Sequence, residues 1–275
     1  MSILLQWNLD GYYKRLAELQ QLTAQYNPIV IALQETHLTP SRNTNLSKYN
    51  TYRFDYHNPP SNHAWRSALL ISTSYKAHRI STPSALQNVA LSVSIPQLHT
   101  LPITFCSVYI PPSHNTSSSD ITALILSLPP PFILCGDFNA HSPTWGLTSN
   151  KNFRTNARGN IIDHLLATHN DLILLNHPNT PTHLNSTSGT FSAIDLTLCS
   201  NPLTPKLSWF THPDLCDSDH YPILITSEVS LNNEYKSLPR WLTNKANWLL
   251  FNDMTANTSL LPDPSNPLIA VEAFT

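Results

Sequence analysis

The stretch Phe132-Ile-Leu-Cys-Gly-Asp-Phe-Asn139 decides the fold prediction, because it joins an apolar strand directly to polar side chains. Its apolar run is typical of a strand inside a sheet. Gly136 permits a close backbone approach, and Asp137 and Asn139 follow where such a strand ends. A carboxylate buried there costs free energy unless it is paired or binds a cation. The stretch therefore predicts a sheet whose strand ends carry a polar site.

Other acidic residues repeat this placement along the chain. Glu35 ends the run IVIALQE, Asp195 interrupts FSAIDLTL, and Asp219 follows the polar turn CDS. Similar settings hold Asn8, Asp10 and Asn139. A single strand-end acid is usually a cap or turn residue, but several in one chain favour a shared site. Carboxylate and amide oxygens suit Mg²⁺ or Mn²⁺.

His220 stands between Asp219 and an apolar strand, which sets it apart from most of the 13 histidines. A histidine with a carboxylate partner can hold one tautomer and transfer protons near neutral pH. We expect the other histidines to be solvated or structural.

Short apolar runs bounded by turn residues predict a layered α/β or α+β domain. The expected strands are Ile3–Trp7, Ile29–Gln34, Tyr52–Tyr56, Ala68–Ser72, Val89–Ile95, Ile103–Ile110, Phe132–Phe138, Leu172–Leu175, Phe191–Cys199, Lys206–Phe210 and Tyr221–Val229. Helical spacing predicts helices at Tyr12–Tyr26, Asp120–Leu128 and Ile161–His169. The expected domain is 1–229, and 230–275 is interpreted as a linker or the truncated start of a following region.

Composition limits the function classes. The chain has 275 residues, 41% of them apolar, which is enough for a sizeable core. No apolar run approaches the roughly 18 residues that span a bilayer, and the N-terminus lacks the features of a secretory signal. The pI near 6.7 excludes a strongly basic nucleic-acid binder. Residues 40–160, however, hold nine Lys or Arg against three acids, which is compatible with one basic face.

Six short blocks occur in a fixed order between residues 6 and 225: WN-x-DG, LQE, VY-x-P, GDFNA, S-x-IDL and SDH. This series resembles the endonuclease/exonuclease/phosphatase family. The longer stretches GDFNAHSPTWG, NARGNIIDHLL, NDLILLN, PTHLN and SAIDLTLCS are similar to the endonuclease domain of non-LTR retrotransposons of the jockey or I-element kind. The tail PRWLTNKANWLLF resembles the segment that leads toward a reverse transcriptase. The resemblance implies a DNase I-like four-layer α/β sandwich, with two packed mixed β-sheets flanked by helices.

The resemblance also implies roles for individual residues. The implied catalytic residues are Asn8, Glu35, Tyr109, Asp137, Asn139, Asp195, Asp219 and His220. The implied metal-side residues are Glu35, Asp10, Asn8 and Asp219, with Mg²⁺ as the cofactor and Mn²⁺ as a possible substitute. Within this set, Asp137 would activate water or assist the leaving group, Asp195 would orient the histidine, and Tyr109 would contact the scissile phosphate.

The function implied is a metal-dependent nick in target DNA that leaves a 3′-hydroxyl for retrotransposon insertion. DNA is the expected partner, with element RNA and a reverse-transcriptase domain in a longer polyprotein, and the nucleus is the expected site of action. The expected DNA contacts are Arg66, Arg154, Arg158, Thr190 and Ser192, with the turn at 183–190 as a DNA-reading hairpin.

Three alternatives remain open. One is a host AP endonuclease or exonuclease of the same fold, which would prefer abasic over intact DNA. The segment Tyr109-Ile-Pro-Pro112 lacks the asparagine of repair-type enzymes, which weakens this alternative. Another is a phosphatase or sphingomyelinase, and the last is a catalytically inactive folded remnant of a retroelement.

Overall fold

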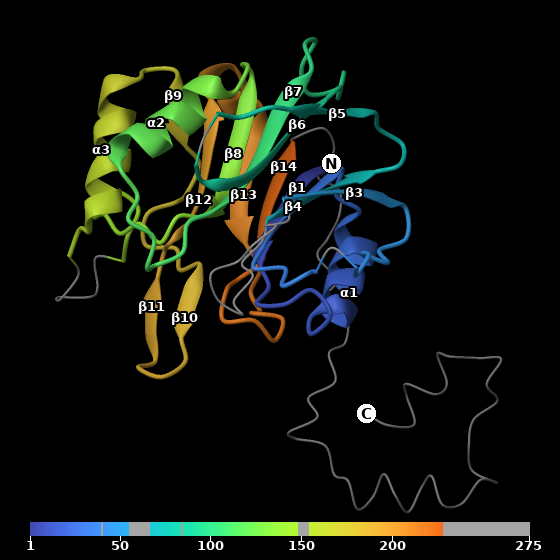
Figure 1. Ribbon diagram of the computed structural model, residues 1–275, viewed down its shortest axis with the longest axis horizontal. Coiled ribbons are helices and arrows are strands. Elements are labelled where there is room, and N and C mark those ends of the chain that lie inside the picture. The colour runs from blue at the N-terminus through green and yellow to red at the C-terminus, as the bar shows by residue number, and fades with distance from the viewer. Residues whose placement is uncertain (40, 55–66, 84, 148–153, 228–275) are drawn as a thin grey trace, which may run out of the picture. The chain divides into compact units, whose positions relative to one another are not determined.

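Two six-stranded β-sheets pack face to face in the computed structural model, which describes residues 1–39, 41–54, 67–83, 85–147 and 154–227 (Figure 1). The first sheet has the order β13 (Leu207–Thr211), β14 (Ile223–Ser227), β1 (Ser2–Asn8), β2 (Val30–Gln34), β4 (Ala68–Ser72) and β3 (Tyr49–Arg53). The second has the order β5 (Ala77–Ile80), β6 (Gln87–Val93), β7 (Ile103–Tyr109), β8 (Phe132–Asp137), β12 (Asp195–Ser200) and β9 (Leu172–Leu174). A separate hairpin pairs β10 (His183–Asn185) with β11 (Thr190–Ser192).

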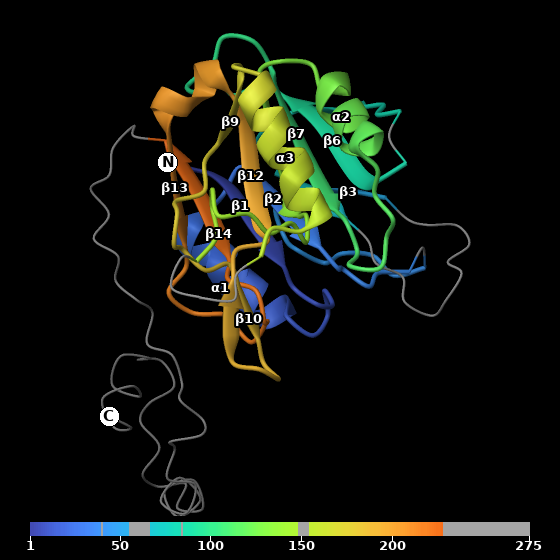
Figure 2. The same cartoon turned by 90° about the vertical axis from the view of Figure 1, so that its left-hand side faces the viewer.

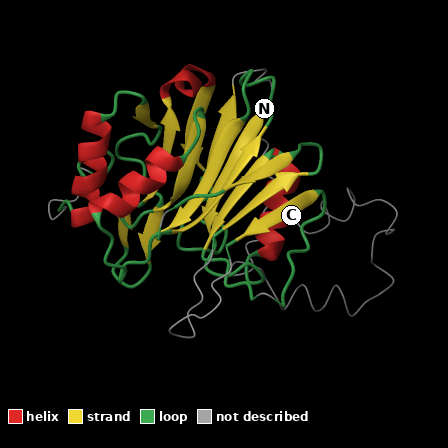
Figure 3. Ribbon diagram, turned by 45° about the horizontal axis from the view of Figure 1, so that its top comes forward, coloured by secondary structure: helices red, strands yellow, loops and turns green. Residues whose placement is uncertain are grey.

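Helices cover the outer faces of both sheets (Figure 3). Helix α1 (Leu16–Tyr26) packs on the first sheet, and α2 (Ser118–Ser127) and α3 (Ala157–Thr168) pack on the second. A 3-10 helix, η1, spans Asn201–Lys206. Strands β1 and β2 are parallel, as are β7 and β8, whereas the other described pairs are antiparallel. The predicted four-layer sandwich with two mixed sheets is therefore confirmed.

The alternation of side chains along each strand builds the layers. In β2, Val30 and Ala32 face the core between the sheets, whereas Ile31 and Leu33 pack toward α1. This period of two is the pleat of a strand buried on both faces. In β7, Phe105 likewise enters the core between the sheets. All of these side chains are at most 1% exposed, so both sheets are covered on each face.

Polar side chains join the two sheets close to the predicted site. The Gln6 amide donates to the Gly136 carbonyl (3.3 Å) and accepts from the Thr197 hydroxyl (2.8 Å). Gln34 donates to the Ser107 hydroxyl (2.9 Å) across the same interface. Because buried hydrogen bonds require specific geometry, these contacts fix the register of one sheet against the other at the site.

Gly136 is required by the close approach of two parallel strands. A Cβ atom at this position would lie 1.8 Å from the carbonyl oxygen of Val108 in β7. No side chain fits there, so glycine lets β8 carry Asp137 to the end of the sheet.

Some element boundaries differ from the prediction. Helix α1 begins at Leu16 rather than Tyr12, because the chain between them forms turns. The expected strand Phe191–Cys199 is interrupted after Ser192 and resumes at Asp195. Strand β5 was missed because its polar sequence AHRI lies half-exposed at the sheet edge. Strand β3 starts earlier than Tyr52, and residues 55 and 56 lie outside the described residues.

Among the described helices, none has both the length and the apolar character needed to cross a bilayer. The tail predicted at 230–275 lies outside the described residues, and the domain boundary at residue 229 stays a prediction.

Candidate active site

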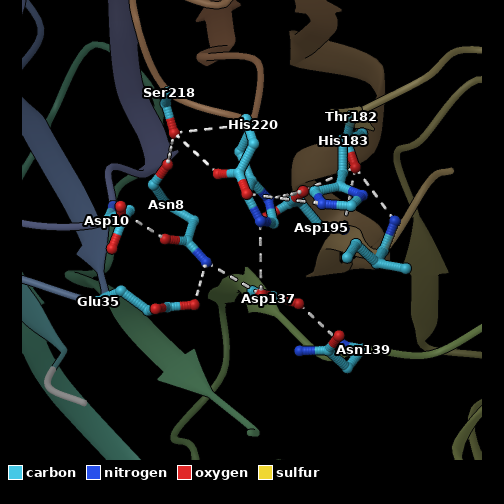
Figure 4. Close-up of polar contacts among 12 residues, drawn as sticks. Asn8, Asp10, Glu35, Asp137, Asn139, Thr182, His183, Asp195, Ser218 and His220 are labelled. Carbon is cyan, nitrogen blue, oxygen red and sulfur yellow. Dashed lines mark hydrogen bonds and ion pairs between the residues drawn. The ribbon is translucent and has the colours of Figure 1, made fainter. Parts of the chain in front are cut away.

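Strand directions bring the predicted site residues to one end of the sandwich. The carboxyl ends of β1 and β2 lie side by side, as do those of β7 and β8. Strand β12 begins at this end because it runs antiparallel to β8, and the segment before β14 reaches it because β14 runs antiparallel to β1. The side chains gathered in this way include Asn8, Glu35, Asp137, Asn139, Asp195 and His220 (Figure 4). Tyr109 lines the same cleft.

One half of the site is a buried hydrogen-bonded network around His220. The imidazole Nδ1 lies 2.8 Å from the Asp195 carboxylate, and both side chains are at most 6% exposed. The same carboxylate oxygen accepts a hydrogen bond from the Thr182 hydroxyl (2.7 Å). The Thr182 oxygen in turn accepts from the backbone N–H groups of Ile194 and Asp195 (3.1 Å each). Asp195 therefore orients the imidazole and is itself held by Thr182.

Asn8 connects this network to the metal-side acids. Its side-chain nitrogen donates to Asp137 and to Glu35, at 3.0 Å in each case. The other oxygen of Asp137 accepts from the backbone N–H of Asn139 (2.9 Å). His220 Nε2 lies 3.9 Å from Asp137. The side-chain oxygen of Asn8 accepts from the Asp10 backbone N–H (3.3 Å), so the structure uses Asn8 chiefly as a donor between carboxylates.

Burial and charge shift the pKa values of this network. Burial raises the pKa of Asp137 well above its ordinary value, and the nearby charge of Asp195 raises it further. Burial alone would lower the pKa of His220, but the charge and hydrogen bond of Asp195 outweigh it and raise the pKa to about 10. Burial also raises the pKa of Tyr109, with additional effects from Glu35 and Asp137. These groups thus retain their protons more firmly than they would in water.

The other half of the site is more open and holds Asp10, Glu35 and His37. Their side chains are 42%, 20% and 36% exposed, respectively. Burial would raise the pKa of Glu35, but interactions with His37, Asn8 and Tyr109 outweigh it and lower the pKa. An ionised carboxylate beside a second acid is a donor set that fits a hard divalent cation.

A cleft of about 620 Å³ opens over the buried half and reaches Glu35 of the open half. Its floor includes Glu35, Tyr109, Asp137 and His220, and its rim includes the β10–β11 hairpin, which projects from the sandwich (Figures 1 and 2). The hairpin predicted at 183–190 is present, and its role in reading DNA stays a prediction. Arg154, Thr190 and Ser192, three of the predicted DNA-contact residues, line the cleft, and Phe191 lies among them with 44% exposure.

The structure corrects the prediction for Arg158. Its guanidinium is buried and donates to backbone carbonyls of residues 110, 111, 112, 114 and 138. Arg158 therefore holds the loop after β7 against α3 and does not face DNA. Arg66 lies outside the described residues. Asp219, predicted on the metal side, is grouped with His183 and His220 rather than with Asp10 and Glu35.

Two histidines that we expected to be solvated or structural lie beside the predicted site residues. His37 lies between Asp10 and Glu35. The ring of His183 lies 4.6 Å from that of His220, and its Nδ1 contacts the Ser192 hydroxyl (2.9 Å). The position of His37 two residues after Glu35 was the only signal for it. His183 comes to the site through hairpin pairing, which its local sequence does not reveal.

Comparison with known proteins supports the same family. Residues 103–224 match the family described as Endonuclease-reverse transcriptase. A probable RNA-directed DNA polymerase from transposon X-element of Drosophila melanogaster is 25% identical over 93% of this chain. The polymerase of the mobile element jockey from the same organism is 27% identical over 79%. The aligned regions span 27% and 23% of these relatives, respectively.

Solved structures share the fold. The endonuclease domain of TRAS1, a telomere-specific non-LTR retrotransposon, matches with a TM-score of 0.64 and 20% identity, covering 82% of this chain and 96% of that one. An AP endonuclease from Archaeoglobus fulgidus matches with a TM-score of 0.62 and 14% identity, covering 83% and 100%.

The fold, the strand-end acids and the sequence relatives agree with the family match, and the chain is similar to members of the endonuclease/exonuclease/phosphatase family, a class of phosphodiester hydrolases. Within that family, its listed relatives and the TRAS1 structure make it similar to the endonuclease domains of non-LTR retrotransposons. The resemblance stated from the sequence is confirmed.

Proposed function

We propose that this domain is a divalent-metal-dependent DNA endonuclease that nicks one strand and leaves a 3′-hydroxyl. The observation that carries the proposal is the continuous polar array from Asp195 through His220 to Asp137 and Asn8, ending at Glu35 beside an open cleft. Its links are hydrogen bonds except the one between His220 and Asp137, which is an ion-pair contact of 3.9 Å. In this proposal Asp137 is the base, protonated His220 faces the phosphate, and Glu35 is the metal-binding carboxylate. All three side chains line the same cleft.

Each of these residues has a chemical task in phosphodiester hydrolysis. The raised pKa of Asp137 suits a carboxyl that takes a proton from the attacking water near neutral pH. The raised pKa of His220 keeps its imidazole charged, so that Nε2 can donate to a phosphate oxygen as negative charge develops. Asp195 and Thr182 fix the direction of that donor before substrate binds.

Glu35 and Asp10 are the residues that would hold the ion, with Mg²⁺ as the expected metal. Asn8 belongs to the same proposal as a supporting residue through its bond to Glu35, whereas Asp219 stands with His183 and His220. A bound divalent cation supplies Lewis-acid stabilisation of the charge on the scissile phosphate and on the leaving oxygen.

DNA enters along the cleft rim. Arg154 supplies positive charge for the phosphate backbone, and Phe191 on the projecting hairpin offers an exposed ring for a base or sugar. Thr190 and Ser192 flank that ring.

The names of the relatives support a purpose for the nick. The two Drosophila relatives are named as a probable RNA-directed DNA polymerase and an RNA-directed DNA polymerase, so a 3′-hydroxyl made at the target would serve as the primer for reverse transcription. In this reading the domain acts in the nucleus, on DNA, beside element RNA and a reverse-transcriptase domain of the same polyprotein.

A plasmid assay tests the proposal. The protein is incubated with supercoiled DNA and Mg²⁺ or Mn²⁺ at low salt, beside Glu35→Gln and His220→Gln. We expect relaxed circles from the parent and from neither variant. Supercoiled DNA left intact by the parent with both metals contradicts an active nickase and favours a folded remnant. Cleavage confined to abasic DNA favours the repair alternative.

A further inference from the structure

We infer that His37 supplies a nitrogen ligand to the metal ion, so that this site binds Mn²⁺ in preference to Mg²⁺. The inference rests on the proposed function, because it concerns the same ion. It assigns His37 a role that the strand-end acids do not predict, and it changes which cation the site selects.

The backbone brings His37 to the acids. Beyond the parallel pair β1–β2, the Gly11 N–H donates to the Glu35 carbonyl and the Tyr12 N–H donates to the Thr36 carbonyl, both at 2.8 Å. These two bonds clamp the loop after β1 against the loop after β2. His37 and Asp10 are consequently held on neighbouring loops, whose arrangement is fixed independently of any ion.

The side chains leave a gap that a cation can fill. The Asn8 amide donates a hydrogen bond to Oε1 of Glu35, and the Lys14 ammonium lies 3.2 Å from Oδ2 of Asp10. Of the remaining oxygens, Oε2 of Glu35 lies 3.7 Å from Nε2 of His37, and Oδ1 of Asp10 lies 3.7 Å from Nδ1. An ion uses only one of these nitrogens, and one ligand atom from each of the three residues lies within 4.8 Å of the others. Both separations are long for a hydrogen bond, yet shorter than twice a metal–ligand bond of about 2.1 Å.

Access also distinguishes this group. His37 and Asp10 are 36% and 42% exposed at their side chains, so an ion can reach them from solvent. In the alternative group formed by Asp137, Asp195 and His220, the side chains are at most 6% exposed and the imidazole Nδ1 already bonds Asp195. The third group, around His183, uses an imidazole whose Nδ1 contacts Ser192.

Ligand chemistry then sets the selectivity. Mg²⁺ prefers an all-oxygen environment and retains its waters, whereas imidazole binds transition-metal ions such as Mn²⁺ more readily. Two carboxylate oxygens with one imidazole nitrogen therefore favour Mn²⁺ more than the carboxylates alone would.

Mn²⁺ binding to the full chain, followed by electron paramagnetic resonance, tests this assignment. Loss of the free-ion signal gives the affinity, pulsed spectra report ¹⁴N coupling from an imidazole ligand, and competition gives the Mg²⁺ affinity. The test variant is His37→Asn, since asparagine tolerates the positive φ of 51° at this position and offers oxygen in place of nitrogen. His78→Asn, at an exposed histidine of β5, is the matched control.

We expect ¹⁴N coupling in the parent and in His78→Asn, and none in His37→Asn. The Mn²⁺ affinity of His37→Asn should fall by about 10-fold or more, as when a group supporting a metal is lost. Its Mg²⁺ affinity should change by less than about 3-fold, because the two carboxylates remain.

Three results would overturn the inference: absence of Mn²⁺ binding or ¹⁴N coupling in the parent, coupling that persists in His37→Asn, or coupling lost in His183→Asn instead. Plasmid nicking by the same samples separates the two proposals. Nitrogen coupling without nicking contradicts only the proposed function, whereas nicking without nitrogen coupling contradicts only the role of His37.

Discussion

The two halves of the site are built on different principles. Around His220, charged groups are almost wholly buried and meet at hydrogen-bond distances, with 2.8 Å between Nδ1 and Asp195. Around His37, the side chains are partly exposed. The Nδ1 atom of His37 lies 3.7 Å from the Asp10 carboxylate, and Nε2 lies 3.7 Å from the Glu35 carboxylate. In the first half, the charged groups are held by hydrogen bonds within the protein. In the second half, carboxylate oxygens of Glu35 and Asp10 lie too far from His37 for a hydrogen bond, and a bound cation would neutralise their charge. Asn8 bonds to a carboxylate in each half.

Because of this difference, variants in the two halves should affect nicking activity and metal affinity differently. A change in the buried half should remove activity and leave metal affinity largely intact. A change in the open half should remove both.

The largest expected effect comes from Asp137→Asn. The amide cannot accept a proton from water, so the nicking rate should fall by about 10³-fold or more, within the range for loss of a positioned general base. Initial rates on supercoiled plasmid measure the effect, and a Mn²⁺-induced rise in melting temperature should persist in the variant. A variant with more than a tenth of the parent rate would show that another group takes the proton.

Metal binding gives the next effect. A Mn²⁺ concentration of 100 Kd should raise the free energy of unfolding of the parent by about 2.7 kcal/mol. Glu35→Gln should lose most of this rise because it removes the anionic ligand, while Asp195→Asn should keep it. Thermal melts with Mn²⁺ and with EDTA measure the difference. An equal loss in both variants would contradict the separation of the halves.

Substitutions at Thr182 should have a smaller effect on stability and on the nicking rate, and its size should depend on the side chain introduced. Thr182→Val removes the hydroxyl that holds Asp195 and leaves two buried N–H groups without their acceptor, which costs about 1–3 kcal/mol in stability. The nicking rate should fall by about 10-fold as His220 loses its fixed orientation. Thr182→Ser keeps the hydroxyl and should restore both quantities. A serine variant as impaired as valine would show that the methyl group, not the hydroxyl, matters.

The stability of the metal-free protein should depend on pH through His220. The folded state raises the pKa of this group from 6.5 to about 10, so its stabilising contribution is complete below about pH 6.5 and declines toward pH 10. One proton allows a slope of at most about 1.4 kcal/mol per pH unit. Urea unfolding in EDTA between pH 6 and 10 measures it, and His220→Gln should flatten the decline. An unchanged slope in that variant would exclude His220 as its source.

Local patterns predicted a layered α/β or α+β domain and the strand-end acids, whereas the four-layer sandwich was implied by the family resemblance. Apolar runs that end in Glu35 or Asp137 show a strand and its functional end in a single stretch of chain. The roles of His183 and Thr182 depend on pairing between the hairpin and the rest of the site, including the bridge from His183 to His220. Such long-range contacts leave no periodic signal in one sequence.

Arg158 shows the opposite error. Its position beside a basic, polar segment favoured a DNA contact, yet the start of α3 directs its guanidinium toward carbonyls of the loop after β7. A side chain with five donors can satisfy several buried carbonyls at once, so a basic residue near a site can serve the fold instead of the substrate.

The central claim is most directly tested by the chemistry of the nicked end. Circles nicked by the parent protein with Mn²⁺ or Mg²⁺ are purified and offered to a DNA polymerase with labelled nucleotides. The account predicts immediate extension, because hydrolysis leaves a 3′-hydroxyl, and no nicking once EDTA is present. Extension only after a phosphatase has removed a 3′-phosphate, or nicking that persists in EDTA, would contradict it.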